Sequence, residues 1–126
     1  MGRIYERDIK TFLSGKKPET LFITHVHYDH CGAASYLKKV FNGMKIALSE
    51  RASEIIKRPN AQKLMAELSG NVLNLIDKMG IVDKGLLIRD AFEIFEPDTI
   101  IYDGQTMHFE GGIDIDIIAT PGHTRD

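Results

Sequence analysis

The feature that most constrains this chain is a short run of strand-forming residues that ends in potential metal ligands. Thr20–Thr24 contains β-branched and aromatic residues, and it follows Pro18, which favours an extended backbone before it. Four potential ligands come directly after this run: His25, His27, Asp29 and His30. We therefore expect a buried strand whose carboxyl end presents a metal-binding loop.

The spacing of these four residues suits metal binding. His25 and His27 are two residues apart, so in an extended segment their imidazoles project to the same side and can share a metal. Asp29 continues this alternation, whereas the adjacent His30 points differently, as a ligand of a second metal must. Imidazole and carboxylate suit zinc, and also iron or manganese, while a single cysteine argues against a closed structural zinc site. An open coordination position is therefore expected.

Helical periodicity surrounds the predicted strand. Apolar residues at helical spacing predict an amphipathic helix over Ile4–Leu13 and a second helix over Ala33–Phe41, which Asn42-Gly43 ends. Met44–Leu48 is the next predicted strand, and Ser49 is positioned to cap the helix that follows it. This order of elements indicates an α/β fold.

A helical insert or cap is predicted at about residues 51–80. Arg58-Pro59-Asn60 should end its first helix, and from Ala61 to Met79 the apolar residues follow one helical face. Core packing is the favoured role of this apolar face. A cap over the substrate and a homodimer contact are the alternatives.

The remainder of the chain is strand-like. Asp103-Gly104 and Gly111-Gly112 are predicted turns, which gives two short hairpins. The predicted strands are Leu86–Arg89, Ala91–Phe95, Thr99–Tyr102, Thr106–Phe109 and Ile113–Thr120. No linker interrupts residues 1–126, so the chain is expected to form one domain of layered α/β architecture.

A third histidine, His123, lies in the turn Thr120-Pro121-Gly122-His123-Thr124, where proline and glycine fix a tight backbone path after a strand. A lone histidine here would favour a surface role, but the first cluster makes metal ligation the better interpretation.

Asp126 is not expected to bind the metal, because a chain end rarely fixes a ligand. His108 is predicted on the exposed side of a strand, and Cys31 is predicted to be a buried packing residue.

Together these two segments resemble the metallo-β-lactamase superfamily. Thr24-His25-Val26-His27-Tyr28-Asp29-His30-Cys31-Gly32 is similar to the His-x-His-x-Asp-His signature, and Thr120–Thr124 is similar to the second signature. The resemblance implies that His25, His27 and His123 hold one metal and that Asp29 and His30 contribute to another, usually with zinc at both. Asp29 would also orient the attacking hydroxide. Thr24, Thr120 and Thr124 are candidates for supporting contacts.

The resemblance also implies an αβ/βα sandwich built from two similar halves. Against that pattern the chain is expected to be a partial domain that lacks flanking strands and the second half. The carboxylate that usually bridges the metals and a final histidine would lie beyond His123. The missing carboxylate and histidine would complete the two-metal site, whereas the three-histidine site needs only His25, His27 and His123.

The function implied is a hydrolase with two zinc ions per complete site, acting on an ester, thioester, lactone or related bond of a small molecule. Histidine at position 27 excludes the glutamate variant of the diiron relatives. Iron-dependent persulfide oxidation is an alternative, and a non-catalytic metal-binding fragment is another. A net charge of −2 gives no support to nucleic-acid binding. The lack of long apolar runs or a leader pattern makes the cytoplasm the expected location, without a membrane role.

Overall fold

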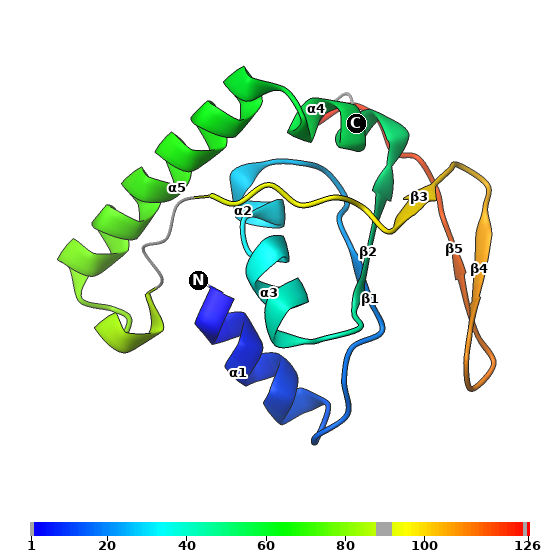
Figure 1. Ribbon diagram of the computed structural model, residues 1–126, viewed down its shortest axis with the longest axis horizontal. Coiled ribbons are helices and arrows are strands. Elements are labelled where there is room, and N and C mark those ends of the chain that lie inside the picture. Colours follow the sequence, from blue (N-terminus) through cyan, green and yellow to red (C-terminus); the bar gives the residue numbers. More distant parts are fainter. Residues whose placement is uncertain (1, 88–91, 125) are drawn as a thin grey trace.

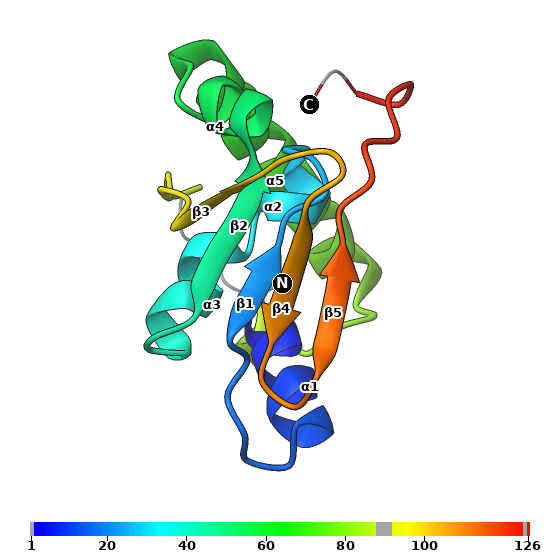
Figure 2. The same cartoon turned by 90° about the vertical axis from the view of Figure 1, so that its right-hand side faces the viewer.

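The computed structural model describes residues 2–87, 92–124 and 126. Its centre is a three-stranded parallel sheet in the order β1–β2–β3, with β2 in the middle (Figures 1 and 2). The strands are β1 at Thr20–Phe22, β2 at Lys45–Ser49 and β3 at Thr99–Ile101. Parallel strands need crossover connections, and helices supply them here.

The described residues contain five α-helices in addition to this sheet. Ser49 caps α4, as predicted, by accepting a hydrogen bond from the backbone N–H of Ala52. The helix break predicted at Arg58-Pro59-Asn60 also occurs, since α4 ends at Ile56, although Pro59 is itself the first residue of α5. The helices are α1 at Gly2–Phe12, α2 at Tyr28–Cys31, α3 at Ala34–Val40, α4 at Glu50–Ile56 and α5 at Pro59–Met79. The helices expected near residues 4–13, 33–41 and 61–79 are therefore confirmed to within a few residues.

A separate two-stranded antiparallel sheet follows β3. It consists of β4 at Thr106–Phe109 and β5 at Ile113–Asp116. Gly111 and Gly112 both have positive φ angles in the turn between them, a conformation that glycine adopts without a steric penalty. Phe109 lies edge-on to Phe22 of β1, with ring centroids 6.0 Å apart, so this hairpin contacts the parallel sheet.

The main hydrophobic core lies at the carboxyl end of β1 and β2. Ile46 and Leu48 of β2 are fully buried, and they belong to the same cluster as Ile23, Val26 and Cys31. Ile23 and Val26 flank the predicted metal-binding histidine His25 in the sequence. Burial of these neighbours fixes the backbone from which the histidines project.

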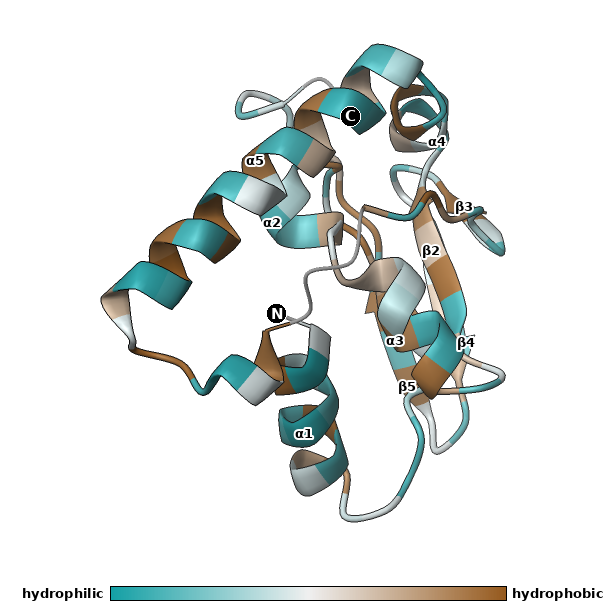
Figure 3. Cartoon of the chain, turned by 60° about the vertical axis from the view of Figure 1, so that its left-hand side comes forward, coloured by the Kyte–Doolittle hydropathy of each residue, from teal (hydrophilic) through white to brown (hydrophobic). Residues whose placement is uncertain are grey.

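The apolar face of the long helix α5 is only partly covered by other described residues. Met65 is buried and Ala61 packs against the core, which confirms part of the predicted core packing. The prediction is wrong for four residues of the same face, which are between 36% and 58% exposed: Leu64, Leu68, Leu75 and Met79. Figure 3 shows hydrophobic segments recurring along α5. The homodimer contact and the cap over the substrate stay predictions.

Two of the predicted strands are not strands where the structure describes them. Leu86 belongs to a short 3₁₀ helix, Lys84–Leu86, in which Asp83 accepts a hydrogen bond from the N–H of Gly85. Residues 88–91 lie outside the described residues, and 92–95 form no strand. Phe95 is buried in the main core cluster, Phe92 packs against that cluster, and Pro97 follows, so this apolar segment contributes to the core without forming a strand.

Only one of the two predicted hairpins occurs in the described chain. β3 pairs in parallel with β2 rather than antiparallel with β4, and Ile100 packs against the main core cluster. β5 ends at Asp116, four residues before the predicted end at Thr120. The predicted α/β class is nevertheless confirmed, while the domain limits of 1–126 stay a prediction.

Candidate metal centre

The first two predicted ligands lie on the loop between β1 and α2. Ile23 and Val26 are only 3% and 4% exposed, while His25 is partly buried and His27 is exposed. His27 occupies the position before the first turn of α2 in an extended conformation, with φ −80° and ψ 148°. The buried residues thus anchor the loop, and the histidine side chains project away from the core.

Three histidines come together from opposite ends of the chain. One ring nitrogen from each of His25, His27 and His123 can be chosen so that all lie within 4.8 Å of one another. The ring centroids are 4.8 to 5.1 Å apart, and the ring planes meet at 81° to 89°. The three imidazoles are therefore close to mutually perpendicular, an arrangement in which their nitrogens converge without the rings stacking on each other.

His25 carries the clearest sign that the cluster suits a cation. Its Nδ1 lies 3.1 Å from the Thr24 hydroxyl oxygen, while its Nε2 is buried and has no hydrogen-bond partner. A buried polar atom without a partner is costly. If Nδ1–H donates to Thr24, the tautomer leaves the Nε2 lone pair available to a metal. Thr24 is thus in contact with the ligand that the sequence analysis expected it to support.

The surroundings of His25 favour its neutral imidazole form over the protonated form. Burial lowers the pKa of His25, and the nearby imidazoles of His30, His27 and His123 lower it further, while Asp126 acts in the opposite direction. A metal ligand must be the neutral imidazole. The cluster therefore disfavours the protonated His25 that would repel a cation.

The donor set fits zinc in chemistry and approximately in spacing. Zinc–nitrogen bonds of about 2.0–2.1 Å at tetrahedral angles place two nitrogens roughly 3.4 Å apart. The nitrogens of His25, His27 and His123 lie within 4.8 Å, so a cation would draw them closer together. Three protein nitrogens leave a further coordination position for water or substrate, as in catalytic zinc sites.

Asp29 and His30 lie beside the three-histidine cluster rather than within it. The His30 ring lies 4.0 Å from that of His25, centroid to centroid, and its Nε2 is 3.8 Å from the Asp29 carboxylate. Both side chains are about half exposed, at 58% for Asp29 and 48% for His30. They are near enough to form a second site next to the first, and their ligand role stays a prediction.

Asp126 takes part in the site in a way that the sequence analysis did not anticipate. Its carboxylate accepts a 2.7 Å hydrogen bond from the backbone N–H of Val26, between the two histidines of the first loop. The bond joins the segment of His123 to that loop across 100 residues of sequence. The sequence shows an acidic residue three positions after His123, but only the three-dimensional structure shows that its partner is the Val26 N–H.

Comparison with known proteins bears on the same residues. The family model described as the metallo-beta-lactamase superfamily matches residues 2–126. The chain belongs to the metallo-β-lactamase superfamily. No curated protein gives a significant match to the chain. The superfamily typically binds metal ions and is associated with hydrolysis, which agrees with the converging histidines of this member.

The remaining titratable candidates of this metallo-β-lactamase superfamily chain lie outside the cluster. His108 projects from β4 with a side chain that is 76% exposed, and it pairs with Asp114 of β5 at 2.7 Å, so its predicted position on an exposed strand face is confirmed. Cys31 is 1% exposed within the main core, which confirms its predicted packing role. Burial raises the pKa of the Cys31 thiol to about 12, so this thiol stays protonated.

Proposed function

We propose that this protein is a metal-dependent hydrolase that uses two zinc ions to cleave an ester, thioester, lactone or related bond of a small molecule. The observation that carries the proposal is the convergence of His25, His27 and His123, with the buried Nε2 of His25 lacking a hydrogen-bond partner. Membership of the superfamily supports the same class of reaction.

Each of these residues has a distinct task in the proposed reaction. His25, His27 and His123 hold one metal, and Thr24 keeps His25 in the required tautomer and orientation. Zinc held by these residues would supply a hydroxide at neutral pH and would polarise the bond to be cleaved. Asp29 accepts a hydrogen bond from the attacking water and aligns it, while His30 and Asp29 provide the ligands for the second ion.

The test is hydrolysis of a panel of generic esters, thioesters and lactones by the zinc-loaded protein. His27→Ala should reduce kcat/KM by at least a hundredfold, since it removes one of three nitrogen ligands. His108→Ala is the matched control, because His108 is an exposed histidine of the β4–β5 hairpin that does not belong to the converging group. Equal activity of the His27→Ala variant and the wild type would refute the proposal.

Metal content separates this proposal from its alternatives. Iron-dependent persulfide oxidation predicts iron in the purified protein and oxygen consumption with a thiol persulfide, whereas stoichiometric zinc supports hydrolysis. A non-catalytic metal-binding role predicts zinc binding without turnover of any substrate class. Manganese is a further metal to assay.

Location and wider partners follow the same proposal. Across the described residues, no helix is both long and apolar enough to cross a bilayer. We place the protein in the cytoplasm because its one cysteine forms no internal disulfide and needs no oxidising compartment. Nucleic acid is not a proposed partner.

A further inference from the structure

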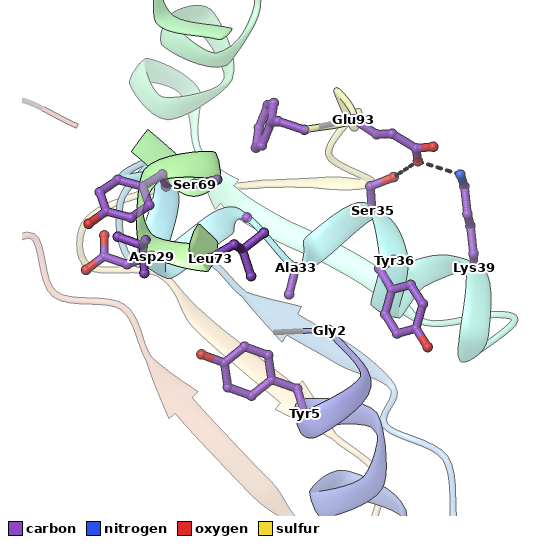
Figure 4. A pocket seen from close by; sticks show the side chains of 14 residues that line it. Gly2, Tyr5, Asp29, Ala33, Ser35, Tyr36, Lys39, Ser69, Leu73 and Glu93 are labelled. Carbon is purple, nitrogen blue, oxygen red and sulfur yellow. Dashed lines mark hydrogen bonds and ion pairs between the residues drawn. The ribbon is translucent and has the colours of Figure 1, made fainter. Parts of the chain in front are cut away.

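A cavity of about 300 Å³ lies beside the metal-binding loop, at the lower end of the range typical of small-molecule sites. Helices α1, α2, α3 and α5 form its walls, together with the segment that contains Phe92 (Figure 4). No single segment builds it, so the cavity exists only in the folded chain.

The lining of this cavity is mainly apolar. Val72 and Leu73 of α5, Ala33 before α3 and Phe92 contribute aliphatic and aromatic surface, and Tyr5 rises into it from α1. Tyr36 also lines the cavity, but its hydroxyl is engaged by Glu6, so the ring is what it offers to an occupant. Apolar lining of this kind binds hydrocarbon rather than strongly hydrated groups.

The charged groups at one end are already paired. Glu93 accepts a hydrogen bond of 2.8 Å from the Ser35 hydroxyl and forms an ion pair with Lys39 (Figure 4). Lys39 therefore offers no unpaired cation to a carboxylate, and Glu93 would repel one. The electrostatics favour a neutral occupant.

The other end of the cavity is part of the metal motif. Tyr28 and Asp29 line the cavity, and Asp29 lies 3.8 Å from His30, whose ring lies against that of His25. Figure 4 shows Asp29 and Leu73 on the same side of the cavity, with Tyr5 on the opposite wall. A group attached to a bond held at the histidines can extend from there into the cavity.

We propose that this cavity binds a neutral, apolar acyl group of the substrate and that Val72 and Leu73 of α5 form part of the wall against which this group lies. This inference rests on the proposed hydrolase function and specifies its substrate class. It also gives α5 a role in specificity in addition to its packing against the core. The Glu93 carboxylate at the paired end disfavours acyl groups that themselves end in a carboxylate.

The experiment uses p-nitrophenyl esters of increasing acyl length with the zinc-loaded 126-residue chain. From acetyl to octanoyl, kcat/KM should rise about three- to fourfold for each methylene that enters the cavity. A phenylacetyl ester tests whether an aromatic group is accepted in place of an aliphatic one. A glutaryl ester, whose chain ends in a carboxylate, should be at least tenfold poorer than the hexanoyl ester.

Leu73→Trp is the variant that fills the cavity, and Leu75→Trp is its matched control. Leu75 lies on the same helix, is 56% exposed and is not part of the lining. Leu73→Trp should lower the ratio of octanoyl to acetyl kcat/KM at least tenfold, whereas Leu75→Trp should leave this ratio within twofold of wild type. Ser69→Leu, a smaller change in the same wall, decides the question if Leu73→Trp does not fold.

Binding of the neutral dye N-phenyl-1-naphthylamine keeps the test independent of catalysis. Saturable binding of one dye per chain that Leu73→Trp weakens at least tenfold, without effect of Leu75→Trp, supports the cavity even if no ester is cleaved. Absence of ester hydrolysis would then count against the hydrolase proposal alone. A kcat/KM that does not depend on acyl length, or an unchanged ratio in folded Leu73→Trp, would overturn the inference.

Discussion

Removing the carboxylate of Asp126 should weaken zinc binding although Asp126 is not among the three converging histidines. Its hydrogen bond from the Val26 N–H ties the His123 segment to the loop of His25 and His27. The backbone N–H of Ala119 donates to the Asp103 carboxylate. Among the described residues that follow Ala119, the Asp126–Val26 hydrogen bond is the one that links the His123 segment to the rest of the molecule. Without it, the metal itself must order His123.

The size of the effect follows from the strength of that bond. A hydrogen bond to a charged acceptor contributes about 1.5–3 kcal/mol, and each 1.4 kcal/mol is a factor of ten in Kd. The bond is only partly buried, so the lower part of this range applies. Asp126→Ala should therefore raise the Kd for zinc roughly tenfold, as measured by calorimetric titration against a competing chelator.

Asp126→Asn is the variant that separates the hydrogen bond from the charge. The asparagine side chain keeps an acceptor oxygen for Val26, whereas both variants lose the negative charge. A retained neutral hydrogen bond of about 1 kcal/mol predicts that Asp126→Ala binds zinc about fivefold more weakly than Asp126→Asn. If the two variants bind zinc equally while both remain folded by circular dichroism, the anchoring argument is wrong.

Three further predictions concern other contacts of the fold and site. Thr24→Val removes the hydroxyl beside Nδ1 of His25 at nearly constant shape and should weaken zinc binding about fivefold, while Thr24→Ser should stay within twofold, by the same titration. The Cys31 thiol, whose pKa burial raises to about 12, should react with a thiol reagent at pH 8 only after unfolding in denaturant, and rapid labelling of the native chain would contradict this. The Lys38 ammonium, and after it the Ile46 N–H, lower the pKa of the Asp98 carboxyl below its value in the unfolded chain. Asp98 therefore stabilises the fold at pH values above its unfolded pKa of about 3.9, and this stabilisation is lost as the pH falls through the folded pKa. In urea titrations, Asp98→Asn should therefore cost about 1 kcal/mol at pH 7 and progressively less in acid, and a loss that does not change with pH would exclude this explanation.

Local sequence signals were sufficient for most elements of this fold. Ser49 as a helix cap and Pro59 as a break between two helices both act within about one turn, and the structure has α4 beginning directly after Ser49 and a new helix beginning at Pro59. The strand-like apolar segment around Phe95 misled the prediction because alternation shows that a side chain is buried, not that its backbone has a neighbouring strand. Phe95 is buried in the core without such a neighbour. Strand pairing depends on which edge is free, and that is a property of the whole sheet.

The site divides in the same way between local and long-range information. His25 and His27 were recognisable as a pair because extended backbone fixes their relation within three residues. His123 was recognisable through the turn that presents it and through its resemblance to a known signature. The partner of Asp126 was not predictable, because it is a backbone N–H 100 positions away that carries no mark in the sequence. The cavity was not predictable either, because residues from four helices and from the segments at Gly32-Ala33 and Phe92-Glu93 form its lining.

The two halves of the histidine cluster differ in how firmly the chain holds them. His25 and His27 follow a strand whose partner β2 is fully buried at Ile46 and Leu48, so the core fixes their loop. His123 follows a two-stranded hairpin and an exposed turn, and its segment depends on the contact between Asp126 and Val26. His25 and His27 therefore form a preformed half of the predicted metal site. The Asp126–Val26 contact restricts the His123 segment before a metal binds, so metal binding would have less conformational entropy to remove.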